Sequence, residues 1–260
     1  MKLIDTHCHL DFADFDADRS ALLAAMAAKG VIAAIVPGVS ANHWQNVLAL
    51  AAAHPNIYPA LGTHPCFIDQ SQPDDLNRLE ALIDKQQKKL VAIGECGLDF
   101  VVAQTDEQRQ LQLVYFNAQL VLAKQFKLPV IIHHRKSHDI ILRQLRAHKL
   151  PKGGVVHAFS GSYQQAKQYL DLGFKLGVGG TVTYERAIKT RDVIAKVPLA
   201  GLVLETDAPD MPIYGRQGAR NSPEFINEIF TVLTQLRDEP ASDIEAQLLN
   251  NTREVFGLQV

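Results

Sequence analysis

The sequence predicts an α/β protein with a (β/α)8 TIM barrel fold, and three observations lead to this prediction. Short apolar runs alternate along the chain with segments of helical spacing. The eight runs are almost continuously apolar, as expected of parallel strands that are covered on both faces. The length of 260 residues is close to that of one such barrel. We therefore expect residues 1–260 to form a single barrel domain.

The eight apolar runs are bounded by turn residues and supply the predicted strands in chain order. These strands are 2–7, 31–39, 57–65, 90–99, 129–134, 154–161, 174–180 and 201–209. Between them lie segments with apolar residues at helical spacing, which include 18–29, 74–89, 106–126 and 163–172. Two more helical segments, 222–236 and 242–256, follow the last strand. We expect these C-terminal helices to close the barrel.

The composition narrows the class of protein and its compartment. Hydrophobic residues make up 47% of the chain, and the formal net charge is −2, so any phosphate binding must be local. The three cysteines, Cys8, Cys66 and Cys96, form no CxxC pair, which favours a reducing compartment. The most apolar stretch, 21–36, is interrupted by a lysine and a glycine, so it does not resemble a membrane span. We expect a monomeric cytoplasmic protein that does not bind membranes.

Polar residues gather at the carboxyl ends of the predicted strands, where barrel enzymes place their catalytic groups. His7 and His9 are two residues apart, so on a strand both side chains would point to one face and could share a metal ion. Taken alone, the HxH pattern could equally be two polar histidines at a loop mouth. The other strand ends strengthen the metal interpretation, because imidazoles and carboxylates from several strands would converge there. They carry His64, Glu95, Asp99, His133, His134, His157, Glu205 and Asp207.

Glu95 and Asp207 are the candidate carboxylate ligands. An unpaired acid is costly to bury, so each of these carboxylates needs a partner. The alternative to a metal ion is a salt bridge at the barrel mouth with Arg135. A pair of metal ions about 3.5–4 Å apart needs a carboxylate that bridges them. Glu95 lies on the fourth strand, between the first and the sixth, and is the better-placed bridge.

His133 and His134 are adjacent at the end of the fifth apolar run. Neighbours on a strand point to opposite faces, so at most one of the two histidines can share a site with the inward residues. By the same rule Cys8 and Cys96 should point away from the ligand side. We expect both to pack as small apolar side chains against the helices. From the strand pattern alone, which of the two histidines faces inward stays open.

Three segments of the chain resemble the signature segments of the TatD family, a group of metal-dependent hydrolases related to the amidohydrolase barrels. They are LIDTHCHLD at the start, PVIIHHRKSHD in the middle and VIAKVPLAGLVLETDAP near the end. GTHP, GECGLD, HAFSG and ARNSP resemble further family segments in the same order. The resemblance extends from about residue 3 to residue 256.

The resemblance implies a site with two divalent metal ions. One ion would be held by His7, His9, Glu95 and Asp207, and the other by Glu95, His133 and His157. His64 and Glu205 would also belong to the active site, near a substrate phosphate or behind the ligands. His134 and Ser137 depart from the family pattern, which puts the shape of the substrate pocket in doubt. His134 would point away, and Arg135 would reach a phosphate or pair with Asp99.

The expected chemistry is hydrolysis by a metal-activated water, with Asp207 as the candidate general base. An imidazole-rich set favours Zn²⁺, Mn²⁺ or Ni²⁺ over Mg²⁺. The family's activity implies a deoxyribonuclease acting on phosphodiester bonds. The alternatives are a hydrolase of a small ester, lactone, amide or phosphomonoester without a nuclease role, and a non-catalytic metal-binding scaffold. A non-catalytic scaffold would be expected to lack one or two of the ligand residues of the family, and this sequence has all of them. Basic residues in the predicted rim loops are Arg135, Lys136, Arg186, Arg216 and Arg220.

Overall fold

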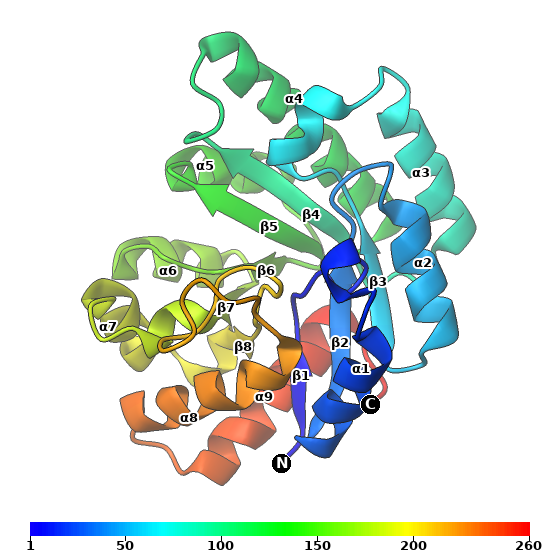
Figure 1. Cartoon of the computed structure of the whole chain (residues 1–260). Helices are drawn as coiled ribbons and strands as arrows, with labels where there is room; N and C mark the ends of the chain where they lie inside the picture. Colours follow the sequence, from blue (N-terminus) through cyan, green and yellow to red (C-terminus); the bar gives the residue numbers. More distant parts are fainter.

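The computed structural model describes all 260 residues and shows a (β/α)8 barrel, as the sequence predicts. Eight parallel strands are hydrogen-bonded side by side in chain order, and the helices lie around them (Figure 1). The strands are β1 (Leu3–Asp5), β2 (Val31–Pro37), β3 (Ile57–Leu61), β4 (Ala92–Asp99), β5 (Val130–Arg135), β6 (Gly154–Val156), β7 (Phe174–Val178) and β8 (Leu202–Leu204).

The helices alternate with these strands, apart from the two that follow β8. They are α1 (Arg19–Ala28), α2 (Trp44–Ala53), α3 (Asp75–Gln86), α4 (Asp106–Phe126), α5 (His138–His148), α6 (Tyr163–Asp171), α7 (Ile188–Lys196), α8 (Ile226–Leu236) and α9 (Ala241–Phe256). Local sequence sets some of their ends. Thr105 and Gln108 form a capping box at the start of α4, and Ser162 and Gln165 do the same for α6.

Several strands are shorter than the sequence predicts. β1, β6 and β8 each have three residues, whereas the apolar runs that predict them continue for several more. The chain beyond these strands stays buried but leaves the regular ladder to enter the rim of the barrel. Histidines and carboxylates that were placed on strand ends therefore lie in the loops that follow, except on β4 and β5.

The buried apolar side chains form two layers that follow the alternation of the strands. Along β5, Val130 and Ile132 belong to a large outer cluster together with helix residues, whereas Ile131 belongs to a smaller inner cluster. We call this smaller set the inner cluster; it lies inside the barrel below the rim. Its members are Ile4, Ala33, Ile35, Ala60, Val91, Ala92, Ile131, Val155, Val203, Val255, Phe256 and Leu258.

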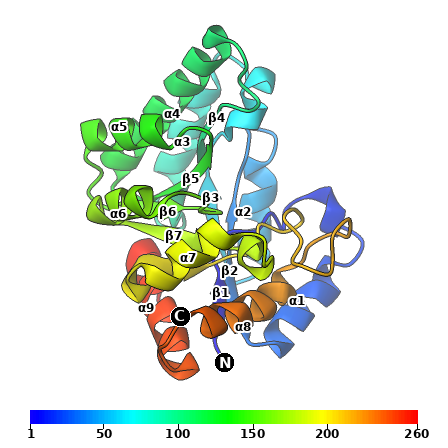
Figure 2. The ribbon, with the colours of Figure 1, turned by 90° about the vertical axis from the view of Figure 1, so that its left-hand side faces the viewer.

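The last helix closes the lower end of the barrel. Val255 and Phe256, at the end of α9, and Leu258 beyond it pack into the inner cluster, which accounts for the predicted closing role of the C-terminal helices. The two termini lie on this side of the molecule in both ribbon views (Figures 1 and 2). None of the helices is both long and apolar enough to cross a membrane.

The two edge strands, β1 and β8, are joined by the side chain of Asp5. This buried carboxylate accepts hydrogen bonds from the Thr206 hydroxyl (2.5 Å), the Thr206 N–H (3.0 Å) and the His7 N–H (3.1 Å). Two backbone hydrogen bonds cross the same seam just after β1. Thr6 N–H donates to the Leu204 carbonyl and Asp207 N–H donates to the His7 carbonyl, both at 2.9 Å. Asp5 therefore fixes His7 and Asp207 beside each other.

Candidate metal centre

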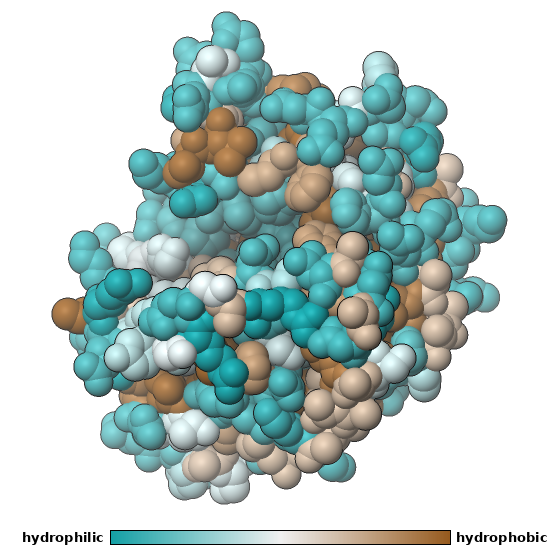
Figure 3. Space-filling model, viewed as in Figure 1, coloured by the Kyte–Doolittle hydropathy of each residue, from teal (hydrophilic) through white to brown (hydrophobic).

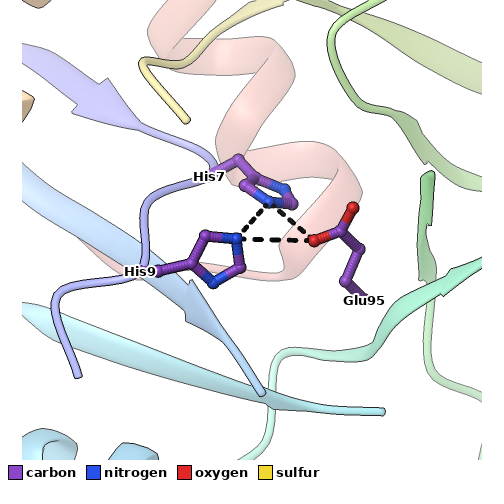
Figure 4. Close-up of side chains that lie close together, drawn as sticks. All are labelled: His7, His9 and Glu95. Atoms are coloured by element: carbon purple, nitrogen blue, oxygen red, sulfur yellow. Dashed lines mark hydrogen bonds and ion pairs between the residues drawn. The ribbon is translucent and has the colours of Figure 1, made fainter. Parts of the chain in front are cut away.

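His7 and His9 come from the loop after β1 and not from the strand itself, so the argument that placed them on one strand face is wrong. Their side chains nevertheless converge, because the loop is held against β2 and β8. His9 N–H donates to the Ala208 carbonyl (2.7 Å), and His9 Nδ1 lies 3.3 Å from the Pro37 carbonyl oxygen. Figure 4 shows both imidazoles pointing toward the carboxylate of Glu95, which comes from β4.

Four side chains form the first donor group: His7, His9, Glu95 and Asp207. The two Nε2 atoms of His7 and His9 lie 3.3 Å apart, and Glu95 Oε2 lies 3.1 Å from the first and 3.5 Å from the second. Asp207 Oδ1 lies 3.5 Å from His7 Nε2 and 3.7 Å from His9 Nε2. The backbone of Asp207 has a φ of 61°, which is uncommon outside glycine and turns this side chain toward the histidines.

The other oxygen of Glu95 faces a second donor group. Glu95 Oε1 lies 3.2 Å from His133 Nδ1, 3.3 Å from His157 Nε2 and 3.3 Å from His64 Nε2. His133 is on β5, whereas His64 and His157 follow β3 and β6. The two carboxylate oxygens of one buried residue thus point to two different sets of imidazoles.

His64 differs from the other two imidazoles in its hydrogen bonding. Its Nδ1 accepts the backbone N–H of Cys66 at 3.1 Å, so in the neutral ring the proton is on Nε2. The Nε2 atom that faces Glu95 is then a donor and has no lone pair for a metal. This tautomer, inferred from the hydrogen-bond pattern, favours His64 as a proton donor beside the metal ligands.

The remaining imidazoles each have a carboxylate near their second ring nitrogen. His133 Nε2 forms a hydrogen bond with Asp99 Oδ2 at 3.2 Å, and such a contact leaves Nδ1 free to bind a metal and raises its basicity. His157 Nδ1 lies 3.4 Å from Glu205 Oε1 but forms no hydrogen bond. The sequence pattern placed Asp99 at the end of the fourth strand and offered Arg135 as its partner. Its contact with His133 could have been inferred from the shared inward parity of residues 99 and 133.

Glu205 is fully buried beneath the site and occupies space that a glycine provides. A Cβ atom at Gly177 would collide with the Glu205 carboxylate, which also accepts the backbone N–H of Ala158. Burial raises the pKa of Glu205 well above its usual range, with added repulsion from Asp207 and Asp5. Glu205 therefore supports His157 from below and does not face the open side of the site.

The electrostatics of the site favour cations in both donor groups. Burial lowers the pKa of His9 and His133, but the neighbouring carboxylates outweigh it, and both values rise to about 9. Burial raises the pKa of Glu95, but the interactions with the surrounding imidazoles, above all His64, His7 and His157, outweigh it and hold the value well below its usual range. Burial also raises the pKa of Asp207, to about 8. Each group therefore stabilises one positive charge next to an ionised Glu95.

The residues present fit a divalent metal. When four nitrogen or oxygen atoms surround Zn²⁺ as a tetrahedron at its usual bond length, these donor atoms lie roughly 3.3–3.4 Å from one another. The donor distances in the first group, 3.1 to 3.7 Å, are centred on that value. Histidine with carboxylate is also the donor chemistry that first-row transition metals prefer. The set His7–His9–Glu95 brings its donor atoms within 4.8 Å of one another. The set His64–Glu95–His133 does so as well, but it includes the imidazole whose Nε2 carries the proton.

The site opens into a cavity of about 540 Å³ at the barrel mouth, a size typical of small-molecule sites. Figure 3 shows the corresponding hollow, lined largely by hydrophilic residues, between the side of β4 and β5 and the loop after β8. Arg135 is exposed at the edge of the cavity and forms no ion pair, so the alternative pairings with Asp99, Glu95 and Asp207 are not present.

His134 lies apart from both donor groups. Its ring packs 4.1 Å from that of His138 and 6.1 Å from that of Phe159, in the layer between β5 and its neighbouring helices. This is the outward side that alternation assigns to it, although part of the side chain borders the cavity. Cys8 and Cys96 are fully buried in the outer apolar cluster, as predicted. Cys66 is exposed, and its Sγ lies 3.8 Å from Asp99 Oδ2.

An eight-stranded α/β barrel whose rim carries two histidine groups on one shared carboxylate belongs to the class of metal-dependent hydrolase barrels. Within this class, the chain belongs to the TatD related DNase family, whose model matches residues 4–257. The metal-dependent hydrolase YjjV of Escherichia coli (strain K12) is 49% identical over 257 residues, which cover 99% of this chain and 98% of that protein.

Two further comparisons agree with this assignment. A crystal structure of E. coli YjjV, described as a TatD homologue, superimposes with a TM-score of 0.94 at 48% identity and covers 98% of each chain. A protein of Pantoea ananatis named 3′-5′ ssDNA/RNA exonuclease TatD is 33% identical over 264 residues, covering 98% of this chain and 100% of that protein. The family resemblance that the sequence motifs indicated is therefore confirmed.

Proposed function

We propose that this protein is a phosphodiesterase that uses two divalent metal ions and acts on DNA, with the whole chain working as one barrel domain. The observation that carries the proposal is the position of Glu95, whose Oε2 faces His7 and His9 while its Oε1 faces His133 and His157. A carboxylate with two oxygens toward two donor groups is the arrangement that a bridging ligand requires.

The residues that would hold the metals follow from the two groups. His7, His9, Glu95 and Asp207 would hold one ion, and Glu95, His133 and His157 the other. When bound, such ions lower the pKa of a coordinated water and stabilise negative charge on the attacked group. Zn²⁺, Mn²⁺ and Ni²⁺ suit this imidazole-rich set better than Mg²⁺.

The proposed catalytic roles belong to side chains that face the cavity. Asp207 has 15% of its side chain exposed, compared with 3% for Glu95, and it is the carboxylate best placed to take a proton from water. His64 carries a proton on Nε2 and can donate a hydrogen bond to a phosphoryl oxygen or to the leaving group. Arg135, unpaired at the cavity edge, can bind a phosphate through two parallel hydrogen bonds. Glu205 holds His157 in place.

The position of the site favours a strand end as substrate. The donor groups lie below the rim of the barrel, at the bottom of a cavity surrounded by loops. A single strand can enter such a cavity, whereas an intact duplex is too wide. The name of the Pantoea ananatis relative, an exonuclease on single-stranded nucleic acid, supports the same class of substrate. With a net charge of −2, we expect modest affinity that weakens with salt.

The test compares three DNA substrates: a linear single strand, a blunt duplex and a closed circular duplex. Each is incubated with Mn²⁺ or Zn²⁺, and with a chelator as control. We expect cleavage of the single strand to be fastest, cleavage of the closed circle to be slowest, and the chelator to abolish all of it. If no DNA is cut with any metal while a lactone, amide, ester or phosphomonoester is hydrolysed, the protein is a small-molecule hydrolase and the nuclease proposal fails.

A further inference from the structure

Two phenylalanines line one side of the cavity and do not take part in the proposed chemistry. Phe12 follows β1 and Phe67 lies in the short 3₁₀ helix after β3, Pro65–Gln70. Both rings are only half-buried, although large apolar side chains elsewhere in this barrel are mostly enclosed. We call these two residues the aromatic wall.

The aromatic wall is held rigidly against the metal centre. The Phe12 ring stacks on the His9 imidazole, with ring centres 4.7 Å apart and planes 18° from parallel. The Phe67 ring meets His64 edge to face at 6.0 Å. Between them, His43 contacts both rings, at 5.2 Å and 5.7 Å, and is itself held by the Ser40 hydroxyl at 2.9 Å. The wall thus begins directly beside the donor groups and has a fixed orientation.

The rest of the cavity has a different character. Arg135, at the end of β5, is the only lysine or arginine that lines it, and β5 lies across the barrel from β1. The base of the cavity holds the two donor groups, where a phosphate would bind. The donor groups, Arg135 and the aromatic wall together fit one kind of ligand. It has a phosphate at the base of the cavity and a planar, weakly polar ring that can lie on the wall. A nucleotide has this chemistry, since every base offers a π-face for stacking on an aromatic side chain.

We propose that the aromatic wall binds the base of the nucleotide whose phosphate lies at the metal centre. This inference rests on the proposed function and deepens it, because it names the terminal nucleoside as the unit that the site recognises. Stacking is tolerant of sequence, so the site selects any base over an abasic end but does not read one base over another. The competing explanation is that the two rings only shield His9 and His64 from solvent.

The experiment measures binding by isothermal titration calorimetry to protein saturated with Mn²⁺. The probes are 2′-deoxyadenosine 5′-monophosphate, 2-deoxyribose 5-phosphate, which lacks the base, and inorganic phosphate. We expect the nucleotide to bind at least about fivefold more tightly than the sugar phosphate, the lower range for one stacked base. In Phe67→Leu this ratio should fall toward one, while the affinity for inorganic phosphate stays the same.

Two further variants complete the design. Phe12→Leu should lower the same ratio. Metal analysis of this variant shows whether the loss of the ring that stacks on His9 also removes an ion. If an ion is lost, the result for Phe67→Leu alone tests the inference. Tyr214→Leu, which removes an aromatic ring that is 67% exposed and lies outside the cavity lining, is the matched control and should leave the ratio unchanged.

The possible outcomes separate this inference from the proposed function. Equal affinity of the wild-type protein for nucleotide and sugar phosphate overturns the inference, as does the absence of measurable binding of either. An equal loss of affinity for all three probes in Phe67→Leu also overturns it and shows that the wall only shields the centre. If DNA is cut but the ratio is one, the wall proposal alone fails. If the ratio is high but no phosphodiester is cut, only the nuclease proposal fails.

Discussion

The upper and lower halves of the barrel interior are built from the same strands but have opposite chemistry. Below the rim, the inner cluster takes an inward residue such as Ile4, Ile131 or Val203 from most strands and is sealed by the end of α9. Above it, the inward positions carry imidazoles and carboxylates that converge on Glu95. On β5 the change occurs within two residues, from Ile131 to His133.

This difference shows how the fold divides stability from function. The lower half buries apolar surface against water and contributes stability without contacting the site. The upper half holds several ionisable groups in an environment that disfavours charge, as the raised pKa values of Asp207 and Glu205 show. Such an arrangement is costly to the folded protein unless cations complete it. Substitutions in the two halves should therefore separate metal binding and activity from stability.

The largest effect should come from Glu95→Gln. The amide keeps the shape of the side chain but removes the negative charge that both donor groups share, so neither ion is held well. Stabilisation by bound metal is worth several kcal/mol, and turnover should fall by at least about 10³-fold. Elemental analysis should show metal loss, and added Mn²⁺ or Zn²⁺ should no longer raise the melting temperature. Full metal content in this variant would exclude Glu95 as the shared ligand.

Asp207→Asn should reduce turnover with much less metal loss. Asparagine can still offer an oxygen to a metal, but it cannot accept the proton of the attacking water. A lost general base typically lowers the rate ~10²–10⁴-fold. Steady-state kinetics at saturating metal, together with elemental analysis, measures both quantities. Activity close to wild type would remove Asp207 from the catalytic role.

His64→Gln tests whether this residue donates a proton or binds a metal. Because Nδ1 of His64 accepts from the backbone, we expect the variant to keep its metal content and to lose turnover by about 10²-fold, the lower range for proton transfer by a side chain. The measurements are the same as for Asp207→Asn, with His133→Ala as the comparison for ligand loss. Loss of one ion in His64→Gln would place His64 among the ligands instead.

In the lower half, Phe256→Ala should act only on stability. This ring belongs to the inner cluster and is 5% exposed, so its truncation should lower the free energy of unfolding by about 3 kcal/mol. Urea denaturation of the metal-free protein measures the change. Metal content and turnover of the folded variant should equal those of the wild type. Reduced metal content in the folded fraction would show that the two halves are coupled.

The smallest effect should be seen in His134→Ala, which serves as the neighbour control for His133→Ala. The His133 variant should bind fewer ions, because its Nδ1 faces Glu95 Oε1, whereas the His134 variant should keep all of them. Elemental analysis of the two proteins after identical metal loading gives the comparison. Equal loss in both would contradict the assignment of the two side chains to opposite faces of β5.

Local patterns predicted the strands and helices, and they predicted which side chains share a face where that depends on a single strand. The alternation rule separates Ile131 and His133 from Val130, Ile132 and His134 on β5, and the structure shows the same separation. It fails for His7 and His9, because β1 ends at Asp5 and the two histidines are positioned by a loop. Backbone contacts from β2 and the chain after β8, which no local pattern contains, hold that loop in place.

The sequence by itself determined the order of the strands and helices, the barrel class and the residues available at the rim, because hydrophobic periodicity and chain length constrain these directly. Only the tertiary structure decided how the donors pair. It shows that each oxygen of Glu95 faces a different group and that Asp99 orients His133. These relations depend on distances between side chains from different strands, and the closure of the barrel sets those distances.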